Sequence, residues 1–526
     1  MFLKPITVSL FLILAGGAFA ADHVRPGHLP APTVVDRPPV NVDHVFTPGD
    51  LPQADMPAFP GAEGGGKYSF GGRGGRVIVV TSLEDSGPGT FREAVEAEGP
   101  RIVIFNVAGI IRLESKVHIT NPYLTLVGHT APGDGVVIGG ATVDIDTHDV
   151  VVRYMRFRRG LITSHAARDG AMGTGNPVGN IIVDHSSFSW GLDENISLYR
   201  HTYRAPGEGK LYVGPVRNLT IQWSISSEAL DTYNHAFGGT WGGRNSSFHH
   251  NLFANNTARN PSIGMGFNFN FTNNVLFNWR HRTVDGGDHR SRVNVINNYY
   301  KPGPATRDGP IQYRIGRVQP NPDRADNSIR RWPLWYARGN VVEGYPEVTA
   351  DNWKGMEFHD DPYLDDDALV ELTRSKDPFP MAPVTLRTAE RAYALVLDYA
   401  GASLPRRDDV DERIIREVRT GEVTYKEGNG IITDIEQVGG FPEYHGEPYK
   451  DSSGDGIPDW WKIRFGLDPD DPSDAYLDMS GDGFNNFECF IYGLDPWKYI
   501  DWRDPANNVN TLRDPKNTLV RNPAKP

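Results

Sequence analysis

Cysteine is almost absent from this chain of 526 residues: Cys489 is the single one, so no disulfide can form within the chain. Positive charge is also in deficit, because the formal net charge is −13. That balance argues against a general nucleic-acid or membrane-surface binder, although it leaves room for a local basic cleft. The sequence also lacks a GK[ST] phosphate loop, so its glycine-rich stretch at 59–75 predicts a tight loop that closes the end of a β-structure.

No apolar run is long enough to cross a bilayer, which takes ~20 residues. Residues 1–20 instead have the features of a signal peptide, with Lys4, an apolar stretch at 6–15 and an A-x-A cleavage pattern ending at Ala20. The alternative is a buried N-terminal strand or helix. No cysteine follows the cleavage pattern, so we expect a secreted or periplasmic protein without a lipid or membrane anchor. Residues 21–56 are rich in proline and predict an N-terminal arm.

What the chain does contain is a repeat of short strand-like units. SFHHNLF, FNFTNNVLF and VNVINNYY each carry a central polar pair, and the second members are His250, Asn274 and Asn298, a step of 24 residues twice. Earlier strand centres follow longer steps, at Phe105, Val127, Tyr154, His185 and Trp223. One coil of three short strands and their turns needs roughly 20–25 residues at ~3.3 Å per strand residue. The spacing therefore predicts a parallel β-helix, with loops inserted where the steps are long.

A β-sandwich is the alternative fold, but it would want regular Asn-Gly or Asp-Gly hairpins between strands, and these do not recur here. Strand alternation in the first unit predicts two faces. One face would hold Phe248, His250 and Leu252, and the other His249, Asn251 and Phe253.

Composition divides the chain further. We expect the β-helix at 57–345, a helical and loop segment packed on it at 346–445, a calcium-loop segment at 446–500 and a tail at 501–526. Helical periodicity in the second segment predicts helices at 365–374, 388–399 and 408–419, with Asp408 as the N-cap and Gly421 as the stop signal of the last.

The calcium-loop segment holds two copies of D-x-S-x-D-G-x-x-[DN], the first nine positions of a calcium loop. They are similar to the short DxxGDG repeats of secreted proteins, of the thrombospondin type 3 or dockerin kind. Lys462 and Cys489 stand where the glutamate of position 12 is usual, and Glu488 is a possible substitute. The alternative is two acidic turns without metal. The predicted side-chain ligands are Asp451, Ser453, Asp455 and Asp459 in the first loop and Asp478, Ser480, Asp482 and Asn486 in the second.

Several motifs in residues 59–304 resemble the pectate lyases of polysaccharide lyase family 1. They are FPGAEGGG, RIVIFNVAGII, the Val183-Asp184-His185 strand end and the R-x-P at Arg259 and Pro261, in the order the family has them. The resemblance implies a right-handed parallel β-helix that cleaves α-1,4-linked polygalacturonate by β-elimination. It implies that Arg259 is the base that removes the C5 proton. The alternative is that Arg259 stays protonated and pairs with the substrate carboxylate.

The resemblance also implies Ca²⁺ as cofactor, held by an Asp-x-Asp before the VDH strand and by acids after it. Asp169 and Asp193 match this pattern, whereas Ala171 and Ser197 replace the other two acids. Glu194 and the adjacent Asn195 could compensate. The family's second arginine after R-x-P is absent here, because Gly264 occupies its position.

The expected ligand is pectate, an anionic plant cell-wall polysaccharide, bound by a monomer. A substrate-binding lysine that the family has is missing, and His235 is the nearest polar candidate. A basic loop beside the R-x-P could supply further contacts, unless it is only a solvated loop. Its arginines are Arg280, Arg282, Arg290 and Arg292.

Two other functions stay open. A polygalacturonase-like hydrolase would use Asp184 with Asp193 or Glu194, but the G-H-G and R-I-K motifs of such enzymes are absent. The lost calcium and arginine positions are also compatible with a non-catalytic glycan-binding protein. Asp184 and His185 have the residue types of an acid–base pair, but we expect them to hydrogen-bond along the stack of coils.

Overall fold

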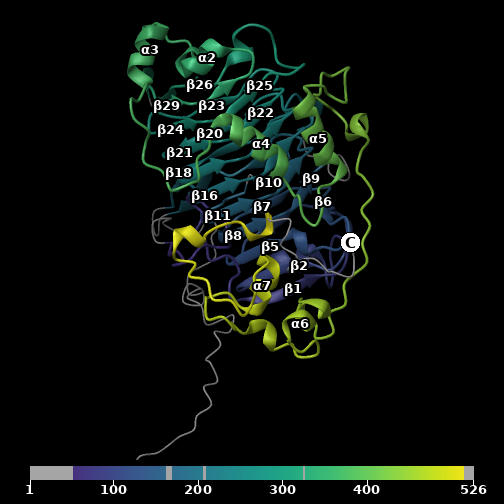
Figure 1. Ribbon diagram of the computed structural model, residues 1–526. Coiled ribbons are helices and arrows are strands. Elements are labelled where there is room, and N and C mark those ends of the chain that lie inside the picture. The colour runs from purple at the N-terminus through teal and green to yellow at the C-terminus, as the bar shows by residue number, and fades with distance from the viewer. Residues whose placement is uncertain (1–50, 161–168, 174, 205–208, 324–325, 514–526) are drawn as a thin grey trace, which may run out of the picture.

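The computed structural model describes residues 51–160, 169–173, 175–204, 209–323 and 326–513 (Figure 1). The predicted signal peptide, most of the predicted arm and the last part of the tail lie outside these ranges. Within them, no helix has the length and apolar character needed to cross a membrane.

The predicted parallel β-helix is confirmed: successive coils place their strands in three stacked sheets whose neighbours pair in parallel. The largest sheet contains β1 (Arg76–Val80), β2 (Arg101–Phe105), β5 (Leu124–Val127), β8 (His148–Arg153), β11 (Gly179–Asp184), β16 (Arg217–Gln222), β18 (Thr240–His249), β20 (Ser262–Gly266), β21 (Phe269–Thr272), β23 (Val284–Gly286), β24 (Arg292–Ile296), β26 (Gly316–Val318), β29 (Leu334–Arg338) and β31 (Met356–Phe358). The second contains β3 (Gly109–Arg112), β6 (Val136–Gly139), β9 (Arg156–Arg158), β12 (Ser187–Ser189), β17 (Ile225–Ser227), β19 (Leu252–Ala254), β22 (Val275–Phe277), β25 (Tyr299–Lys301) and β30 (Val341–Val342). The third contains β4 (Val117–Ile119), β7 (Val143–Ile145), β10 (Met172–Gly173) and β13 (Ile196–Ser197).

Stacked strands continue to β31, past the predicted boundary at residue 345. Two antiparallel hairpins project from the coil, formed by β14 (Arg200–Arg204) with β15 (Leu211–Pro215) and by β27 (Asn321–Asp323) with β28 (Asp326–Arg331).

The predicted step of 24 residues is wrong for the first of the three opening units. The residue that turns the chain between sheets has a left-handed backbone, and it is His250, Asn273 and Asn297 in successive coils, with φ of 56°, 56° and 54°. The steps are therefore 23 and then 24 residues. Because the bend interrupts the strand, the predicted alternation also fails: Phe248 and Phe253 both enter the interior, whereas Leu252 faces outward.

The residue after each bend forms an asparagine ladder along the inside of the coil. Asn251 N–H bonds Asn274 Oδ1 at 2.9 Å, Asn274 N–H bonds Asn298 Oδ1 at 2.8 Å, and the series continues to Asn340. Each of these buried amides thus has the hydrogen-bond partner that burial demands. At the bend, aromatic rings of neighbouring coils stack on one another. The ring centres of His185 and Tyr154 are 4.8 Å apart, and those of His250 and Trp223 are 4.0 Å apart.

The glycine-rich stretch does not close the end of the β-structure as predicted; it crosses the outer face of the largest sheet. Gly65 N–H bonds Ser247 Oγ at 3.2 Å and Gly72 N–H bonds Thr125 Oγ1 at 2.8 Å, so the loop spans several coils. A Cβ at Gly65 would lie 1.8 Å from the Asn245 carbonyl oxygen, which explains why glycine is needed there.

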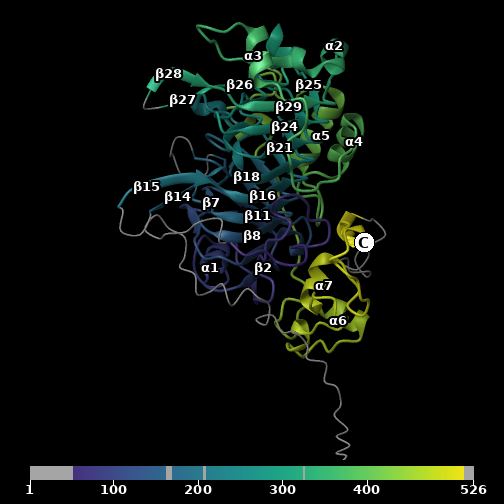
Figure 2. The ribbon, with the colours of Figure 1, turned by 90° about the vertical axis from the view of Figure 1, so that its left-hand side faces the viewer.

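Within the described residues the α-helices are α1 (Phe91–Glu96), α2 (Pro346–Ala350), α3 (Asp366–Thr373), α4 (Ala389–Tyr399), α5 (Asp409–Thr420), α6 (Asp459–Phe465) and α7 (Asn486–Tyr492). Helices α4 and α5 lie along the side of the coil, α2 and α3 lie at one end of it, and α6 and α7 lie at the other end (Figures 1 and 2). The predicted helices are confirmed as α3, α4 and α5, and Asp408 caps α5 by accepting from Asp411 N–H at 2.9 Å. Apolar residues of α4 and α5 pack on β17, β19 and β22.

The C-terminal segment returns to the first coils of the β-helix, so that α6 and α7 lie beside β1 and β2 (Figure 1). Ile457 and Trp461 share a buried cluster with Ile102 and Ile104 of β2. Segments more than 300 residues apart in the chain are therefore joined by apolar burial.

Candidate active site

Three loops from successive coils stack at one edge of the β-helix. The first follows β12 and carries Asp193 and Glu194, the second precedes β18 and carries His235 and Phe237, and the third follows β19 and carries Arg259. Backbone bridges join Glu194 to Phe237 and Phe237 to Ala258, both in parallel register. The stacking that builds the fold thus also brings together residues up to 66 positions apart in the sequence.

Arg259 is the cation of this site. Its Nη1 makes an ion pair with Glu194 Oε1, and its guanidinium carbon lies 4.2 Å from the centre of the Phe237 ring. The side chain is 28% exposed. It is thus oriented by a carboxylate and an aromatic face while remaining open to a ligand.

Glu194 is much less accessible than its partner, with its side chain 8% exposed. Thr240 Oγ1 donates to Glu194 Oε1 at 2.9 Å. Burial raises the pKa of Glu194, and the nearby Arg259 guanidinium counters that effect in part.

His235 and Asp193 form a second pair in the same stack. Their Nδ1 and Oδ1 atoms are 2.8 Å apart, and the His235 side chain is 24% exposed. The imidazole also lies 4.7 Å from the Phe237 ring, so Phe237 contacts both His235 and Arg259. The structure therefore places the predicted substrate-binding histidine beside the predicted catalytic arginine.

The three carboxylates that the sequence suggested for Ca²⁺ do not converge on one point. Asp169 pairs with Lys116 at 2.8 Å and with Arg159 at 3.4 Å, while Asp193 and Glu194 pair with His235 and Arg259. No cluster of three or more acidic, histidine or cysteine side chains fit for a metal occurs in the described residues. Their oxygens are of the type Ca²⁺ prefers, but Asp169 and Glu194 already pair with cations of the chain and Asp193 pairs with the His235 ring, so this arrangement does not fit a calcium cage.

The four predicted substrate-binding arginines fall into two groups. Arg280 and Arg282 lie in the next loop of the stack, where the Arg282 carbonyl accepts from Asn260 Nδ2 at 2.9 Å. Their guanidinium groups pair with Asp231 and Asp285, each at 2.8 Å. Arg280 and Arg282 precede β23, whereas Arg290 and Arg292 follow it. The guanidinium carbon of Arg290 lies 4.9 Å from the centre of the Phe267 ring. The structure therefore places two of the four near Arg259.

Asp184 and His185 have the structural role that was expected of them. Both side chains are almost fully buried, and Asp184 bonds Arg153 at 2.9 Å, Gln222 at 2.7 Å and His185 at 2.7 Å. Although burial favours the neutral acid, pairing with His185 and Arg153 lowers the pKa of Asp184. A carboxylate enclosed in this way cannot reach a polymer, which argues against the hydrolase alternative.

The two acidic segments predicted as calcium loops form compact turns, and the first aspartate of each organises the turn backbone. Asp451 accepts from Gly454 and Gly456 N–H, both at 2.8 Å, and Asp478 accepts from Gly481 at 2.7 Å and Gly483 at 2.9 Å. Glu488 accepts from Asn485 N–H at 3.3 Å in the capping box of α7, and its carboxylate lies 3.6 Å from Arg73 Nε.

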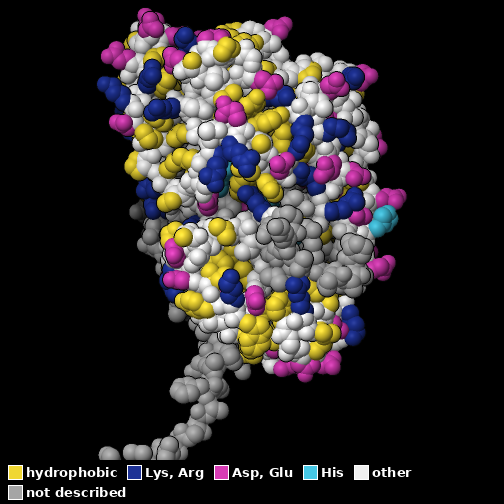
Figure 3. All heavy atoms as spheres, in the orientation of Figure 1, with side chains coloured by type: hydrophobic (Ala, Val, Ile, Leu, Met, Phe, Trp, Pro, Cys, Tyr) yellow, Lys and Arg dark blue, Asp and Glu magenta, His cyan; other side chains and the backbone are white. Residues whose placement is uncertain are grey.

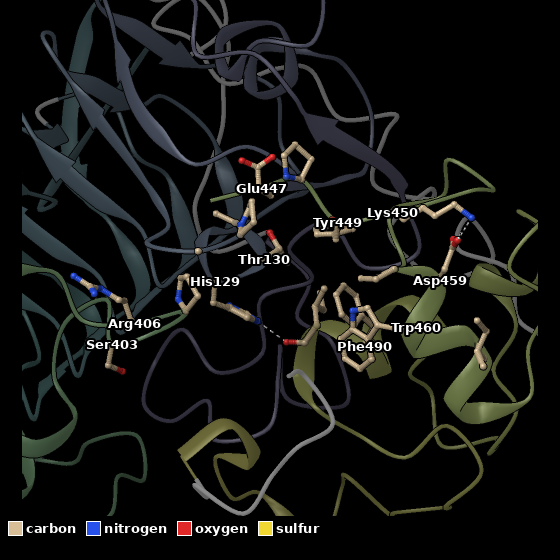
Figure 4. Close-up of a pocket in the computed structure, with 18 residues that line it drawn as sticks. His129, Thr130, Ser403, Arg406, Glu447, Tyr449, Lys450, Asp459, Trp460 and Phe490 are labelled. Carbon is tan, nitrogen blue, oxygen red and sulfur yellow. Dashed lines mark hydrogen bonds and ion pairs between the residues drawn. The ribbon is translucent and has the colours of Figure 1, made fainter. Parts of the chain in front are cut away.

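A cavity of about 1230 Å³ lies elsewhere, between the β-helix and the C-terminal segment (Figure 4). His129, Arg406, Tyr449 and Trp460 are among its lining residues. Asp459 is the one predicted site residue in that lining, so the cavity is separate from the stacked loops around Arg259.

Figure 3 shows that Lys and Arg side chains gather near the middle of one face, so the acidic net charge coexists with a local basic area.

Comparison with known proteins identifies the class. No protein-family model matches the chain. The chain is 35% identical over 432 residues to a probable pectate lyase C of Aspergillus fumigatus, covering 78% of this chain and 88% of the relative. It is 35% identical over 429 residues to the corresponding protein of Emericella nidulans, covering 78% and 87%. The chain therefore belongs to the pectate lyase family.

Solved structures with a similar fold share less of the sequence. The major cedar pollen allergen is 17% identical with a TM-score of 0.42, covering 65% of this chain and 92% of the allergen. Pectate lyase C of Erwinia chrysanthemi, solved with Ca²⁺, is 14% identical with a TM-score of 0.37, covering 67% and 99%.

Several functional neighbours were not predicted from the sequence. Phe237 and Thr240 support the Arg259–Glu194 pair, and Lys116 and Arg159 hold Asp169. The interval from Lys116 to Asp169 carries no spacing signal, because stacking of coils rather than local sequence makes them neighbours. The strand periodicity could have suggested Thr240, which begins β18 directly after the Phe237 loop.

Proposed function

We propose that this protein is a secreted or periplasmic lyase that cleaves pectate or a related polyuronate by β-elimination at the loops around Arg259. The reaction removes the C5 proton, forms a C4=C5 double bond and expels the glycosidic oxygen from C4. The C5 proton lies next to a carboxylate and is very weakly acidic, so the site must neutralise that carboxylate and supply a base. The observation that carries the proposal is an accessible arginine, oriented by Glu194 and Phe237, in a chain of the pectate lyase family.

Arg259 can serve in either of two ways. As a guanidinium, the charged form that arginine keeps in proteins, Arg259 would neutralise the substrate carboxylate with two parallel hydrogen bonds. Resemblance to the family favours Arg259 as the base, and this role requires the substrate to displace Glu194 and the arginine to lose its proton. The same stack of loops offers further polar contacts to a polyanion, from His235, Arg280 and Arg282.

The test is an assay of the purified protein on polygalacturonate that follows ultraviolet absorbance of the unsaturated product together with new reducing ends. We expect both signals from the unchanged protein, and neither from Arg259→Ala if that variant keeps its circular dichroism spectrum. Reducing ends without absorbance would indicate hydrolysis, and neither signal on several polyuronates would support a non-catalytic glycan binder.

Arg259→Lys separates the two roles. A lysine keeps the positive charge but loses the bidentate fork, so a purely electrostatic role predicts raised KM with kcat largely retained. A base role predicts loss of kcat, with a pH profile that differs from that of the unchanged protein.

A further inference from the structure

The side chain of Lys462 ends inside the first predicted calcium loop. Lys462 stands at position 12 of that loop, where a calcium loop usually has its glutamate. Its side chain is 0% exposed. A lysine is almost never buried in this way unless its charge is compensated.

Five oxygen atoms surround the ammonium group. Two are carboxylate oxygens, Asp455 Oδ2 at 2.5 Å and Asp474 Oδ1 at 2.8 Å. The others are Ser453 Oγ at 3.2 Å and the carbonyl oxygens of Asp468 at 3.3 Å and Asp471 at 2.7 Å. The ligand set of carboxylates, hydroxyl and carbonyls is the kind that a hard divalent cation uses, but here it surrounds a lysine.

The remaining acids of the first loop are also occupied. Asp451 accepts backbone N–H groups, as described above. Asp459 turns outward to the cavity side, where Lys450 Nζ lies 2.8 Å from its Oδ2, as the dashed line in Figure 4 marks. Asp459 also accepts from Ser452 N–H at 2.7 Å. A divalent cation entering this loop would meet the ammonium of Lys462 at the centre of its oxygens, and like charges would repel.

We propose that the ammonium group of Lys462 takes the place of the divalent cation in the first loop, so that this loop is a permanently filled, metal-independent cross-link. The assignment of Asp451, Ser453, Asp455 and Asp459 to a bound Ca²⁺ is thereby replaced by an internal ion-pair centre.

The position of the loop gives the cross-link a consequence for the whole molecule. Ile457, inside the loop, and Trp461, in the following helix, belong to the buried cluster that contains Val127 and Ile104 of the β-helix. Gly456 comes so close that a Cβ there would lie 2.8 Å from Val77 Cγ1 and from Ile104 Cδ1. Lys462 thus stabilises, without any metal, the loop that packs the C-terminal segment against the first coils.

The second loop is the internal comparison. It has Cys489 at position 12, and within the described residues its Asp482 accepts from Trp502 Nε1 at 2.9 Å rather than pairing with a lysine. The lysine centre is therefore specific to the first loop. Whether the second loop binds Ca²⁺ stays a prediction from its sequence.

The experiment uses the full-length protein stripped with EDTA and compares thermal unfolding and Ca²⁺ stoichiometry by equilibrium dialysis. Lys462→Met keeps the length of the side chain and removes the ammonium, leaving Asp455 and Asp474 buried together. We expect this variant to lose several degrees of melting temperature in EDTA and to regain part of the loss in millimolar Ca²⁺. Lys498→Met, which removes an exposed lysine of the same segment that lies outside the first loop, is the matched control and should behave like the unchanged protein.

Asp451→Asn supplies a measurement that does not depend on the folding of the lysine variant. We expect the number of Ca²⁺ ions bound per chain to be the same with and without this substitution. The proposal is overturned if Asp451→Asn lowers that number by one, because the unchanged first loop would then hold Ca²⁺. It is equally overturned if Lys462→Met melts in EDTA at the temperature of the unchanged protein.

Discussion

Glu194 in the first stacked loop and Arg259 in the third form an ion pair beside the Phe237 ring of the second, although 65 positions separate them in the sequence. The pair joins the residue that the resemblance implies as catalytic to the acid that we expected to compensate for a lost calcium ligand. A substrate carboxylate that reaches Arg259 must therefore compete with Glu194 for the same guanidinium group.

Glu194→Gln tests this competition. The amide keeps the shape of the side chain and can still accept from Thr240, but it removes the negative charge that holds Arg259. We expect KM for polygalacturonate to fall by about threefold to tenfold, which corresponds to ~0.7–1.4 kcal/mol. Steady-state kinetics measure it, with Asp398→Asn at the exposed pair with Arg419 as a control for net charge. A higher KM in Glu194→Gln would mean that the carboxylate positions Arg259 rather than competing for it.

Metal removal tests how the substrate carboxylate is neutralised. Because Asp169 and Glu194 pair with cations of the chain and Asp193 pairs with His235, we expect lyase activity in EDTA to stay within about threefold of that in millimolar Ca²⁺, a change of less than ~1 kcal/mol. The initial rate of ultraviolet absorbance increase is the readout. If EDTA abolished the activity and added Ca²⁺ restored it, Asp169, Asp193 and Glu194 would have to leave their present partners to bind the metal.

The pH dependence of stability should reflect buried histidines. Burial lowers the pKa of His129 to about 3 and that of His185 to about 4. The unfolded chain binds these protons near pH 6.5, whereas the native protein does not, so stability falls as the pH drops from about 6.5 toward 3–4. Each such histidine contributes a slope of up to ~1.4 kcal/mol per pH unit within that window.

His129→Gln should reduce the pH slope of stability by the contribution of one bound proton, because glutamine does not titrate. Its amide can still donate to the Ile491 carbonyl oxygen, which lies 2.7 Å from His129 Nε2. Urea unfolding at pH 5 and pH 7 measures the change. His445→Gln, at a side chain that is 77% exposed, is the control. An unchanged slope in His129→Gln would contradict the prediction.

A buried ion-pair centre fastens α5 to the β-helix. Arg158 Nη2 lies 2.8 Å from both oxygens of Asp408 and 2.9 Å from Asp411 Oδ1, and all three side chains are buried. Arg158→Met leaves buried carboxylates with less compensation, and we expect a loss of about 3–5 kcal/mol in the free energy of unfolding. Arg419→Ala, which breaks an exposed pair with Asp398, should cost less than ~1 kcal/mol. Equal effects of the two substitutions in urea unfolding would refute the distinction.

The coil, the helices and the candidate arginine could be predicted from the sequence because their signals are local. The last strand units recur at nearly constant spacing, and Thr388 and Asp408 stand directly before the helices they cap. The register of the first unit was missed because residue types other than asparagine also adopt the left-handed bend: His250 occupies the position that Asn273 and Asn297 occupy in the next coils.

By itself, the sequence determined the β-helix, its covering helices, the family and the presence of two acidic loops, since each depends on periodicity or on residues adjacent in the chain. Only the tertiary structure decided which charges meet. Glu194 neutralises Arg259, Lys116 neutralises Asp169 and Lys462 fills its own loop because stacking and burial bring those groups within ion-pair distance. Coulomb energy depends on distance and local dielectric, and neither can be calculated from positions along a chain.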